Sequence, residues 1–229
     1  MQGTPTTAPD PPVSPYTCIM DRALSTIYLA SQSPRRCQLL EQIGVPFEVL
    51  LPDDVIAAER LEEVRAGEAP ATYVRRVTRL KLEQALQQLA HRGDQMRLAL
   101  CADTTVALGQ HILGKPADES DARRMLQQLS GRTHRVLTAV SVGHEKRREQ
   151  ALNVSRVRFG TLTEVELHDY LASDEWRGKA GGYAIQGRAA RFIEHISGSY
   201  SGVMGLPLFE TAALLRSAAQ QLARPAPAH

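Results

Sequence analysis

The sequence is poor in the residues that mark several specialised classes of protein. Its 229 residues include three cysteines, Cys18, Cys37 and Cys101, with no CxxC pair among them. A disulfide framework or a zinc cluster is therefore not expected, and reduced thiols suit a cytoplasmic protein. Cys37 and Cys101 lie in apolar patterns, so we expect both to be small core residues.

Charge of one sign and long apolar runs are also lacking. The formal net charge is only +2, which does not indicate a nucleic-acid-binding protein. No apolar run approaches the ~20 residues that cross a bilayer, so no membrane association is expected. The first residues lack the basic start and the apolar stretch of a signal peptide.

What is present is an ordinary globular composition, with 43% apolar and 23% charged residues. A chain of this length can bury a substantial core, as one large domain or as two lobes. Residues 1–24 are rich in Pro, Thr, Ser and Ala and have no periodicity, which predicts a disordered N-terminal extension. The folded domain is expected over residues 25–222, and a flexible tail over residues 223–229.

Short apolar runs and helical periodicities predict the elements of this domain. Strands are expected at residues 26–30, 47–51, 98–102, 134–142, 154–159 and 192–196, and a hairpin at 106–113. Helices are expected at residues 34–43, 71–90, 118–129, 163–172 and 208–222. Loops or turns are expected at residues 52–69, which are acidic, at 145–150 and at 197–205.

The first strand is followed abruptly by a helix start with two adjacent cations. Ser33 is a good N-cap residue, and Pro34 suits the first helical position. Arg35 and Arg36 then fall in the first turn, where the helix dipole disfavours positive charge. An anion held by the two guanidinium groups, the free N–H groups and nearby serine hydroxyls would explain this arrangement. The alternative is that both arginines lie on a solvated face.

Asp103 follows an apolar run that reads as a buried central strand. Ligands of α/β sheets bind at the carboxyl ends of such strands. Asp103 is therefore a candidate catalytic carboxylate, although an aspartate here could instead cap the following turn.

Two lysines lie in positions where the backbone could aim them inward. Lys81 interrupts the apolar stripe of the 71–90 helix, where a lysine more often extends to the rim of the core. Lys115 lies between Gly114 and Pro116, which by itself is only a turn signal.

A glycine-rich stretch near the C-terminal end could bring backbone close to a ligand. Residues 178–187 include four glycines, but the GxGxxG pattern of dinucleotide-binding proteins is not present. Gln186 lies in this stretch, and its amide both donates and accepts, as the imide edge shared by thymine and uracil requires.

Six short motifs occur in a fixed order along the chain. They are Ser31-Gln32-Ser33-Pro34-Arg35-Arg36, Ala102-Asp103-Thr104-Thr105, Gly114-Lys115-Pro116, Leu129-Ser130-Gly131-Arg132-Thr133-His134, residues 179–187, and Gly205-Leu206-Pro207-Leu208. Together they resemble the motifs of the Maf family of nucleoside triphosphate pyrophosphatases, and most closely the branch that acts on dTTP and UTP.

The resemblance implies a fold and a reaction. The fold is α/β, with a long mixed central sheet and two lobes with a cleft between them, as in ITP pyrophosphatases. The reaction is hydrolysis of the α–β phosphoanhydride of dTTP or UTP, or of modified pyrimidine nucleotides, to the monophosphate and pyrophosphate.

The resemblance also implies roles for individual residues. Asp103 is expected to activate water, directly or as a metal ligand. The triphosphate is expected to be held by Ser31, Ser33, Arg35, Arg36, Lys81 and Lys115. Base selection is assigned to Arg35, Thr104 and Gln186. A divalent cation, Mg²⁺ or Mn²⁺, is expected on Asp54 and Asp103, although Pro52-Asp53-Asp54 departs from the pattern that the family usually has after the second strand.

Two other functions remain open at this stage. The family has been associated with arrest of cell division and septum formation, so a non-catalytic nucleotide-binding regulator is one alternative. The same enzyme class acting on 7-methyl-GTP is the other, although Thr104 and Thr105 favour the pyrimidine branch. The family is often dimeric, which makes a homodimer an expectation from the resemblance alone.

Overall fold

The architecture is that of a mixed α/β protein built on one seven-stranded sheet, in a computed structural model that describes residues 25–94, 97–145 and 147–222. The strands are β1 (Ile27–Leu29), β2 (Phe47–Val49), β3 (Ala99–Leu108), β4 (His111–Leu113), β5 (Thr133–His144), β6 (Arg147–Phe159) and β7 (Ile193–Ser197). Their order is β2-β1-β3-β5-β6-β7, and β4 pairs with β3. Strand β1 is parallel to β2 and β3, whereas the other pairs are antiparallel. The mixed central sheet implied by the resemblance is confirmed.

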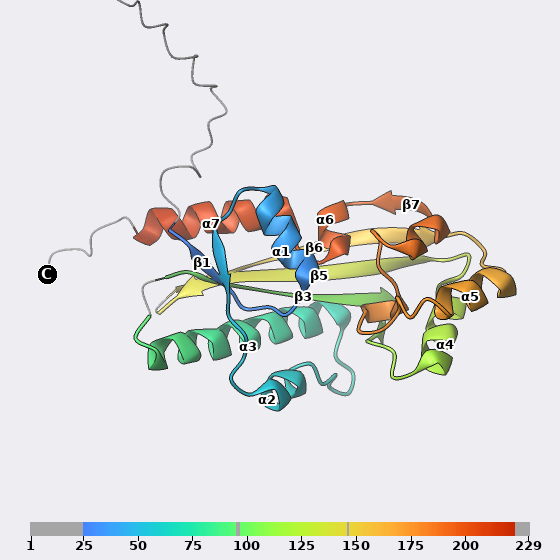
Figure 1. Ribbon diagram of the computed structural model, residues 1–229, viewed down its shortest axis with the longest axis horizontal. Coiled ribbons are helices and arrows are strands. Elements are labelled where there is room, and N and C mark those ends of the chain that lie inside the picture. Colours follow the sequence, from blue (N-terminus) through green and yellow to red (C-terminus); the bar gives the residue numbers. More distant parts are fainter. Residues whose placement is uncertain (1–24, 95–96, 146, 223–229) are drawn as a thin grey trace, which may run out of the picture.

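Helices cover both faces of this sheet (Figure 1). They are α1 (Pro34–Gln42), α2 (Val55–Arg60), α3 (Pro70–His91), α4 (Glu119–Leu129), α5 (Glu164–Leu171), α6 (Tyr200–Met204) and α7 (Leu208–Leu222), with two short 3₁₀ helices, η2 (Ala180–Gly182) and η3 (Arg188–Phe192). Helix α3 runs along one face, α1 and α7 lie on the other, and α4 and α5 gather at one end (Figure 1). Among the described residues, no helix combines the length and the apolar character that crossing a bilayer requires.

The two largest buried clusters occupy different ends of the sheet. One contains Trp176, Tyr170 and Phe159 and joins α4 and α5 to the far ends of β3, β5 and β6. The other contains Ile27, Leu40 and Leu215 and joins α1 and α7 to β1 and the near end of β3. Each cluster is a separate buried core, so the molecule has two lobes on a shared sheet.

Strand β3 is longer than the apolar run that predicts it. The expected strand ends at residue 102, but β3 continues to Leu108 and pairs with β5 from Ala99 to Ala107. Asp103 therefore lies inside the strand and not at its end. The β-branched residues Thr104, Thr105 and Val106 favour the extended backbone and carry the strand onward.

The turn expected at residues 145–150 is mostly strand. Strands β5 and β6 are 12 and 13 residues long and form one hairpin, and Lys146 lies outside the described residues. Arg147 and Arg148 are exposed in β6, so their charges stay in water while their backbone pairs with β5. A charged stretch thus fits a strand whose side chains face solvent.

Two expected loops contain short helices. Helix α2 lies inside the acidic stretch 52–69, and α6 lies inside the Gly/Ser-rich stretch 197–205. Asp54 caps α2 through Ala57 N–H, and Ser199 caps α6 through Gly202 N–H. Helix α5 begins with a capping box, in which Thr163 Oγ1 accepts from Glu166 N–H and the Glu166 side chain accepts from Thr163 N–H. The predictions for residues 1–24 and 223–229 lie outside the described residues.

Candidate active site

A cavity of about 490 Å³ opens beside the middle of β3. Strand β1 pairs with β3 only as far as Leu100, and β4 begins to pair with it at Val106. In the described sheet, residues 101–105 of β3 therefore have β5 on one side and no strand on the other. This gap between β1 and β4 leaves room for a ligand at the centre of the sheet, between the two lobes.

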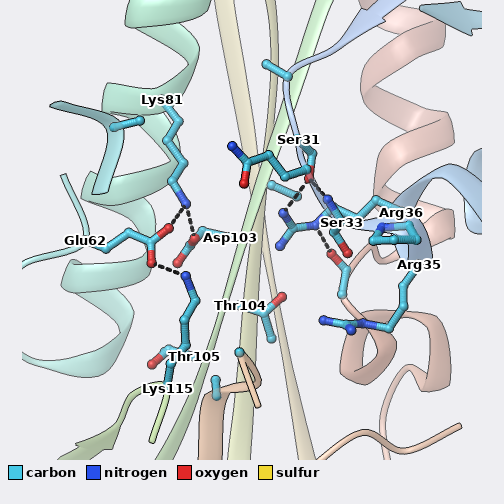
Figure 2. A pocket seen from close by; sticks show the side chains of 18 of the residues that line it. Ser31, Ser33, Arg35, Arg36, Glu62, Lys81, Asp103, Thr104, Thr105 and Lys115 are labelled. Atoms are coloured by element: carbon cyan, nitrogen blue, oxygen red, sulfur yellow. Dashed lines mark hydrogen bonds and ion pairs between the residues drawn. The ribbon is translucent and has the colours of Figure 1, made fainter. Parts of the chain in front are cut away.

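Two lysines and two carboxylates form a connected group on one side of β3 (Figure 2). Lys81 Nζ, from α3, lies 2.6 Å from Asp103 Oδ1 and 2.6 Å from Glu62 Oε1. Lys115 Nζ, just beyond β4, lies 2.7 Å from Glu62 Oε2. Asp103 is buried. The sequence thus brings four charged side chains from four separate segments to one wall of the cavity.

The charges in this group stabilise one another. Burial lowers the pKa of Lys81, but the carboxylates of Asp103 and Glu62 outweigh burial and hold that pKa above its usual value. Burial raises the pKa of Glu62, whereas Lys81 and Lys115 lower it, and the net effect is a pKa of about 2. Near neutral pH, Lys81 is therefore a cation and Glu62 an anion, so neither is suited to accept or deliver a proton there.

Packing of α3 positions Lys81, and a backbone contact positions the hairpin that carries Lys115. Lys81 is half-buried on the stripe of α3 that carries Val74, Val77 and Ala85, all buried against the sheet. Gly114, next to Lys115, accepts a hydrogen bond of 2.9 Å through its carbonyl from Gly181 N–H. The hairpin formed by β3 and β4 is thereby tied to the glycine-rich stretch, with Lys115 directed toward Glu62.

The start of α1 forms the opposite wall of the cavity (Figure 2). Arg36 donates from Nε to Gly205 O over 2.9 Å and from Nη1 to Ser31 Oγ over 3.0 Å. Ser33 N–H also donates to Ser31 Oγ. Burial lowers the pKa of Arg36, and Asp103 opposes that shift. Two of the guanidinium donors therefore bond within the protein. Arg36 thus connects α1 to the residue after α6, and it also adds positive charge to the cavity.

The cavity brings together all but one of the candidate site residues. Its lining includes Ser31, Ser33, Arg35, Arg36, Lys81, Asp103, Thr104, Lys115 and Gln186. Gln186 is exposed, which places it at the open part of the cavity. The lining also includes Val203, Met204 and Ile185, so the cavity has apolar as well as charged lining.

Asp54, which is expected to hold a metal ion together with Asp103, is the exception. It is exposed, it is not part of the cavity lining, and its Oδ1 accepts from Ala57 N–H over 2.9 Å to cap α2. The carboxylate that reaches Lys81 from the acidic stretch is Glu62. No local spacing distinguishes Glu62 from the other acidic residues of this stretch, because its partners lie 19 and 53 residues away.

Two further residues, His134 and Cys101, have a structural role. His134 is buried, and its Nε2 lies 2.7 Å from the Tyr183 hydroxyl, so it supports the cavity wall without lining it. Cys101 is fully buried and burial raises its pKa to about 12, which makes its thiol unreactive.

The donor set of the site can be compared with the needs of metal ions. In the part of the chain that the structure describes, no group of three or more His, Cys, Asp and Glu side chains is arranged to hold a metal ion. Asp103 and Glu62 contact the same ammonium, so their oxygens lie close together. Two carboxylates beside a cavity fit Mg²⁺, which binds through one or two carboxylates, substrate phosphates and water.

Comparison with known proteins gives a consistent result. A family model described as Maf-like protein matches residues 26–218. A protein of Albidiferax ferrireducens named dTTP/UTP pyrophosphatase is 61% identical over 191 residues, which are 83% of this chain and 96% of that protein. A protein of the same name from Polaromonas sp. is 57% identical over 196 residues, covering 86% and 97% of the two chains. Another from Ralstonia nicotianae is 60% identical over 194 residues, covering 84% and 94%.

Proposed function

Since the chain belongs to the Maf family, we infer that it is a nucleoside triphosphate pyrophosphatase that hydrolyses dTTP and UTP. Water attacks the α-phosphorus, the bond between that phosphorus and the bridging oxygen breaks, and pyrophosphate leaves. The observation that carries this proposal is the single cavity shared by Asp103, Lys81, Lys115 and Arg36. Such a cavity can both hold a triphosphate and cleave it.

Asp103 is the residue we assign to water activation. Its Oδ1 accepts from Lys81, which fixes the carboxylate in place, and we expect Oδ2 to take the proton of the attacking water. Lys81 remains protonated because of its two carboxylate partners. It can therefore orient Asp103 and stabilise negative charge that develops on the phosphates, but it cannot act as the base.

Lys115, Arg35 and Arg36 are assigned to the triphosphate together with Ser31 and Ser33. The exposed ammonium of Lys115 is paired with Glu62, and a phosphate oxygen can replace that carboxylate. Arg35 is half-buried beside the cavity, and burial lowers its pKa. A guanidinium that has lost part of its hydration binds an anion well, because the anion supplies hydrogen bonds that water no longer provides.

A divalent cation fits the charge balance of the cavity. Four cationic side chains line it, against the carboxylates of Glu59, Glu62 and Asp103. One net positive charge is less than the negative charge of a triphosphate, so additional positive charge is needed. We propose that Glu62 and Asp103 would hold Mg²⁺ or Mn²⁺ together with phosphate oxygens. When bound, the metal would stabilise negative charge on the phosphates and lower the pKa of a coordinated water.

The proposal is tested by the products released from a panel of nucleotides. We expect dTTP and UTP to yield monophosphate and pyrophosphate in the presence of Mg²⁺, and chelation with EDTA to stop the reaction. Release of inorganic phosphate would contradict cleavage between the α- and β-phosphates. Nucleotide binding without any turnover would favour a non-catalytic regulator, and preferential cleavage of 7-methyl-GTP would assign the chain to another branch of the family.

A further inference from the structure

Two threonine hydroxyls meet beside the cavity on neighbouring strands. Thr104 on β3 is paired directly with Thr138 on β5, and their Oγ1 atoms lie 3.0 Å apart. Thr104 lines the cavity, whereas Thr138 does not and is only 1% exposed. A ligand in the cavity can therefore contact Thr104 but not the residue behind it.

The direction of the hydrogen bond between the two threonines follows from a third group. Thr138 Oγ1 lies 2.7 Å from the carbonyl oxygen of Gly202, and a carbonyl oxygen can only accept. The single hydroxyl proton of Thr138 is therefore committed to Gly202. Thr104 must supply the proton in its contact with Thr138, so its own proton points away from the cavity.

The carbonyl of Gly202 is held firmly in this place. Gly202 N–H donates to Ser199 Oγ over 2.9 Å at the start of α6. A Cβ on Gly202 would lie 2.7 Å from Asn153 Oδ1, so the backbone of α6 packs against β6 too closely for any side chain. The acceptor that orients Thr138 is thus part of the packed lobe and does not depend on a ligand.

With its proton committed, Thr104 offers only lone pairs to the cavity. Among the described residues, the hydroxyl of Thr138 is the one group that hydrogen-bonds Thr104 Oγ1. Ionised phosphate oxygens only accept, so they cannot bond to Thr104 and would be repelled by it. The part of a nucleotide that lies at Thr104 must carry a donor, and the N3–H of uracil or thymine is such a donor, whereas N3 of cytosine is an acceptor.

We propose that Thr138 is a positioning residue for base selection, because it keeps the Thr104 hydroxyl proton out of the cavity. Thr104 then accepts from the N3–H of uracil or thymine and disfavours cytosine. This proposal rests on the proposed function, since it assumes that pyrimidine triphosphates occupy the cavity. It goes beyond that function by assigning selectivity to a buried residue that no ligand touches.

The test compares UTP and CTP, which share the same sugar and triphosphate. In the T138V variant, Thr104 has no acceptor behind it, and its hydroxyl can turn to donate to N3 of cytosine. We expect the ratio of kcat/KM for UTP to that for CTP to fall by roughly tenfold, the value of one hydrogen bond. The conservative T138S variant keeps the proton and the Gly202 contact, so it should keep the wild-type ratio.

A matched control removes an equivalent buried hydroxyl elsewhere. Thr78 is fully buried, donates to the carbonyl of Val74 over 2.7 Å and does not line the cavity. T78V should lose stability as T138V does, with the UTP-to-CTP ratio unchanged. If T138V does not fold, T104V tests the premise that Thr104 is the acceptor for the base, because removal of that acceptor should also lower the ratio.

The outcomes separate this proposal from the function on which it rests. A folded T138V or T104V that cleaves UTP with the wild-type ratio would overturn the role of the threonine pair and leave the pyrophosphatase activity intact. An equal fall in the UTP-to-CTP ratio in T138S and T138V would mean that packing, and not the direction of the proton, sets the ratio. That result would also overturn the proposal. Wild-type protein that releases no pyrophosphate from UTP or dTTP would overturn the proposed function itself.

Discussion

Lys81 Nζ lies 2.6 Å from Asp103 Oδ1, and this ion pair connects α3 to the middle of the central strand. Both side chains are largely removed from water, with exposed fractions of 19% for Lys81 and 10% for Asp103. A largely buried carboxylate is costly unless a cation stays beside it. The pair therefore links the stability of the fold to the chemistry proposed for the site.

Replacement of Lys81 by Met should leave Asp103 as an unpaired buried carboxylate. We expect the free energy of unfolding to fall by about 3 kcal/mol, the cost of breaking a buried pair by removing one partner. Urea denaturation measures this change. The double variant K81M/D103N should recover part of the loss, because the uncompensated charge is gone.

An exposed ion pair on the same helix is the control. Arg79 Nη1 lies 3.0 Å from Glu83 Oε1, and the Arg79 side chain is 58% exposed. R79M should change the free energy of unfolding by less than about 1 kcal/mol. Equal destabilisation by K81M and R79M would mean that the Lys81–Asp103 pair has no special energetic role.

Glu62 and Asp54 can be distinguished as metal ligands by the metal requirement of their variants. E62Q should raise the Mg²⁺ concentration for half-maximal dTTP hydrolysis by roughly tenfold or more, because an amide is a weaker ligand than a carboxylate. D54N should leave the Mg²⁺ requirement as it is, since Asp54 caps α2 outside the cavity. A shifted Mg²⁺ requirement in D54N but not in E62Q would reverse this assignment.

Arg36 should act on substrate binding more than on the chemical step. Lysine cannot reproduce the two guanidinium contacts to Gly205 O and Ser31 Oγ. For R36K we expect the KM for dTTP to rise about tenfold, the effect of one lost hydrogen bond, with a smaller change in kcat. R158K is a suitable control, because Arg158 pairs with Glu194 on exposed strand surface. A wild-type KM in R36K would show that substrate binding does not need the contacts of Arg36 to Gly205 and Ser31.

The stability of the protein should depend on pH through His134. Burial lowers its pKa to about 4, while an unfolded histidine titrates near 6.5. As the pH falls, His134 is protonated in the unfolded chain before it is protonated in the folded chain. The stabilising contribution of His134 is therefore complete above pH 6.5 and is lost as the pH falls toward 4. The free energy of unfolding should therefore fall by roughly 2 kcal/mol between pH 7 and pH 5 on this account.

Urea denaturation of wild type and H134Q at both pH values checks this expectation. Other groups titrate alike in the two proteins, so the difference between their pH slopes isolates His134. The same slope in H134Q as in wild type would mean that His134 is not held neutral by burial.

Much of the fold follows from local signals that the structure confirms. The helices expected at residues 118–129 and 163–172 are examples, because the turn at Gly131, which has φ +65°, and the capping box of Thr163 and Glu166 depend on neighbouring residues only. Asp103 differs, because a charged residue after an apolar run is typical of the end of a strand. Lys81, 22 residues earlier, supplies the cation that lets the strand continue through Asp103. No local pattern contains that information.

The sequence predicts which residues share the cavity where residue type and motif agree, but not where tertiary contact alone decides. Arg36, Lys81, Lys115 and Asp103 line one cavity, as their motifs implied. Asp54 follows the second strand, where the resemblance implies a metal ligand, but an aspartate before a helix caps it equally well. Glu62 comes to the site because the chain between α2 and α3 folds back over Tyr73, whose hydroxyl donates to Glu62 O over 3.0 Å.

The most direct test of the central claim is turnover of dTTP by D103N, measured as pyrophosphate release beside the exposed control D53N. An asparagine keeps an acceptor for Lys81 but is no base. We predict that D103N loses turnover by about 10²–10⁴-fold while it still binds dTTP in calorimetry, and that D53N retains wild-type turnover. Near wild-type pyrophosphate release by D103N would contradict the account, because Asp103 would then have no part in the reaction.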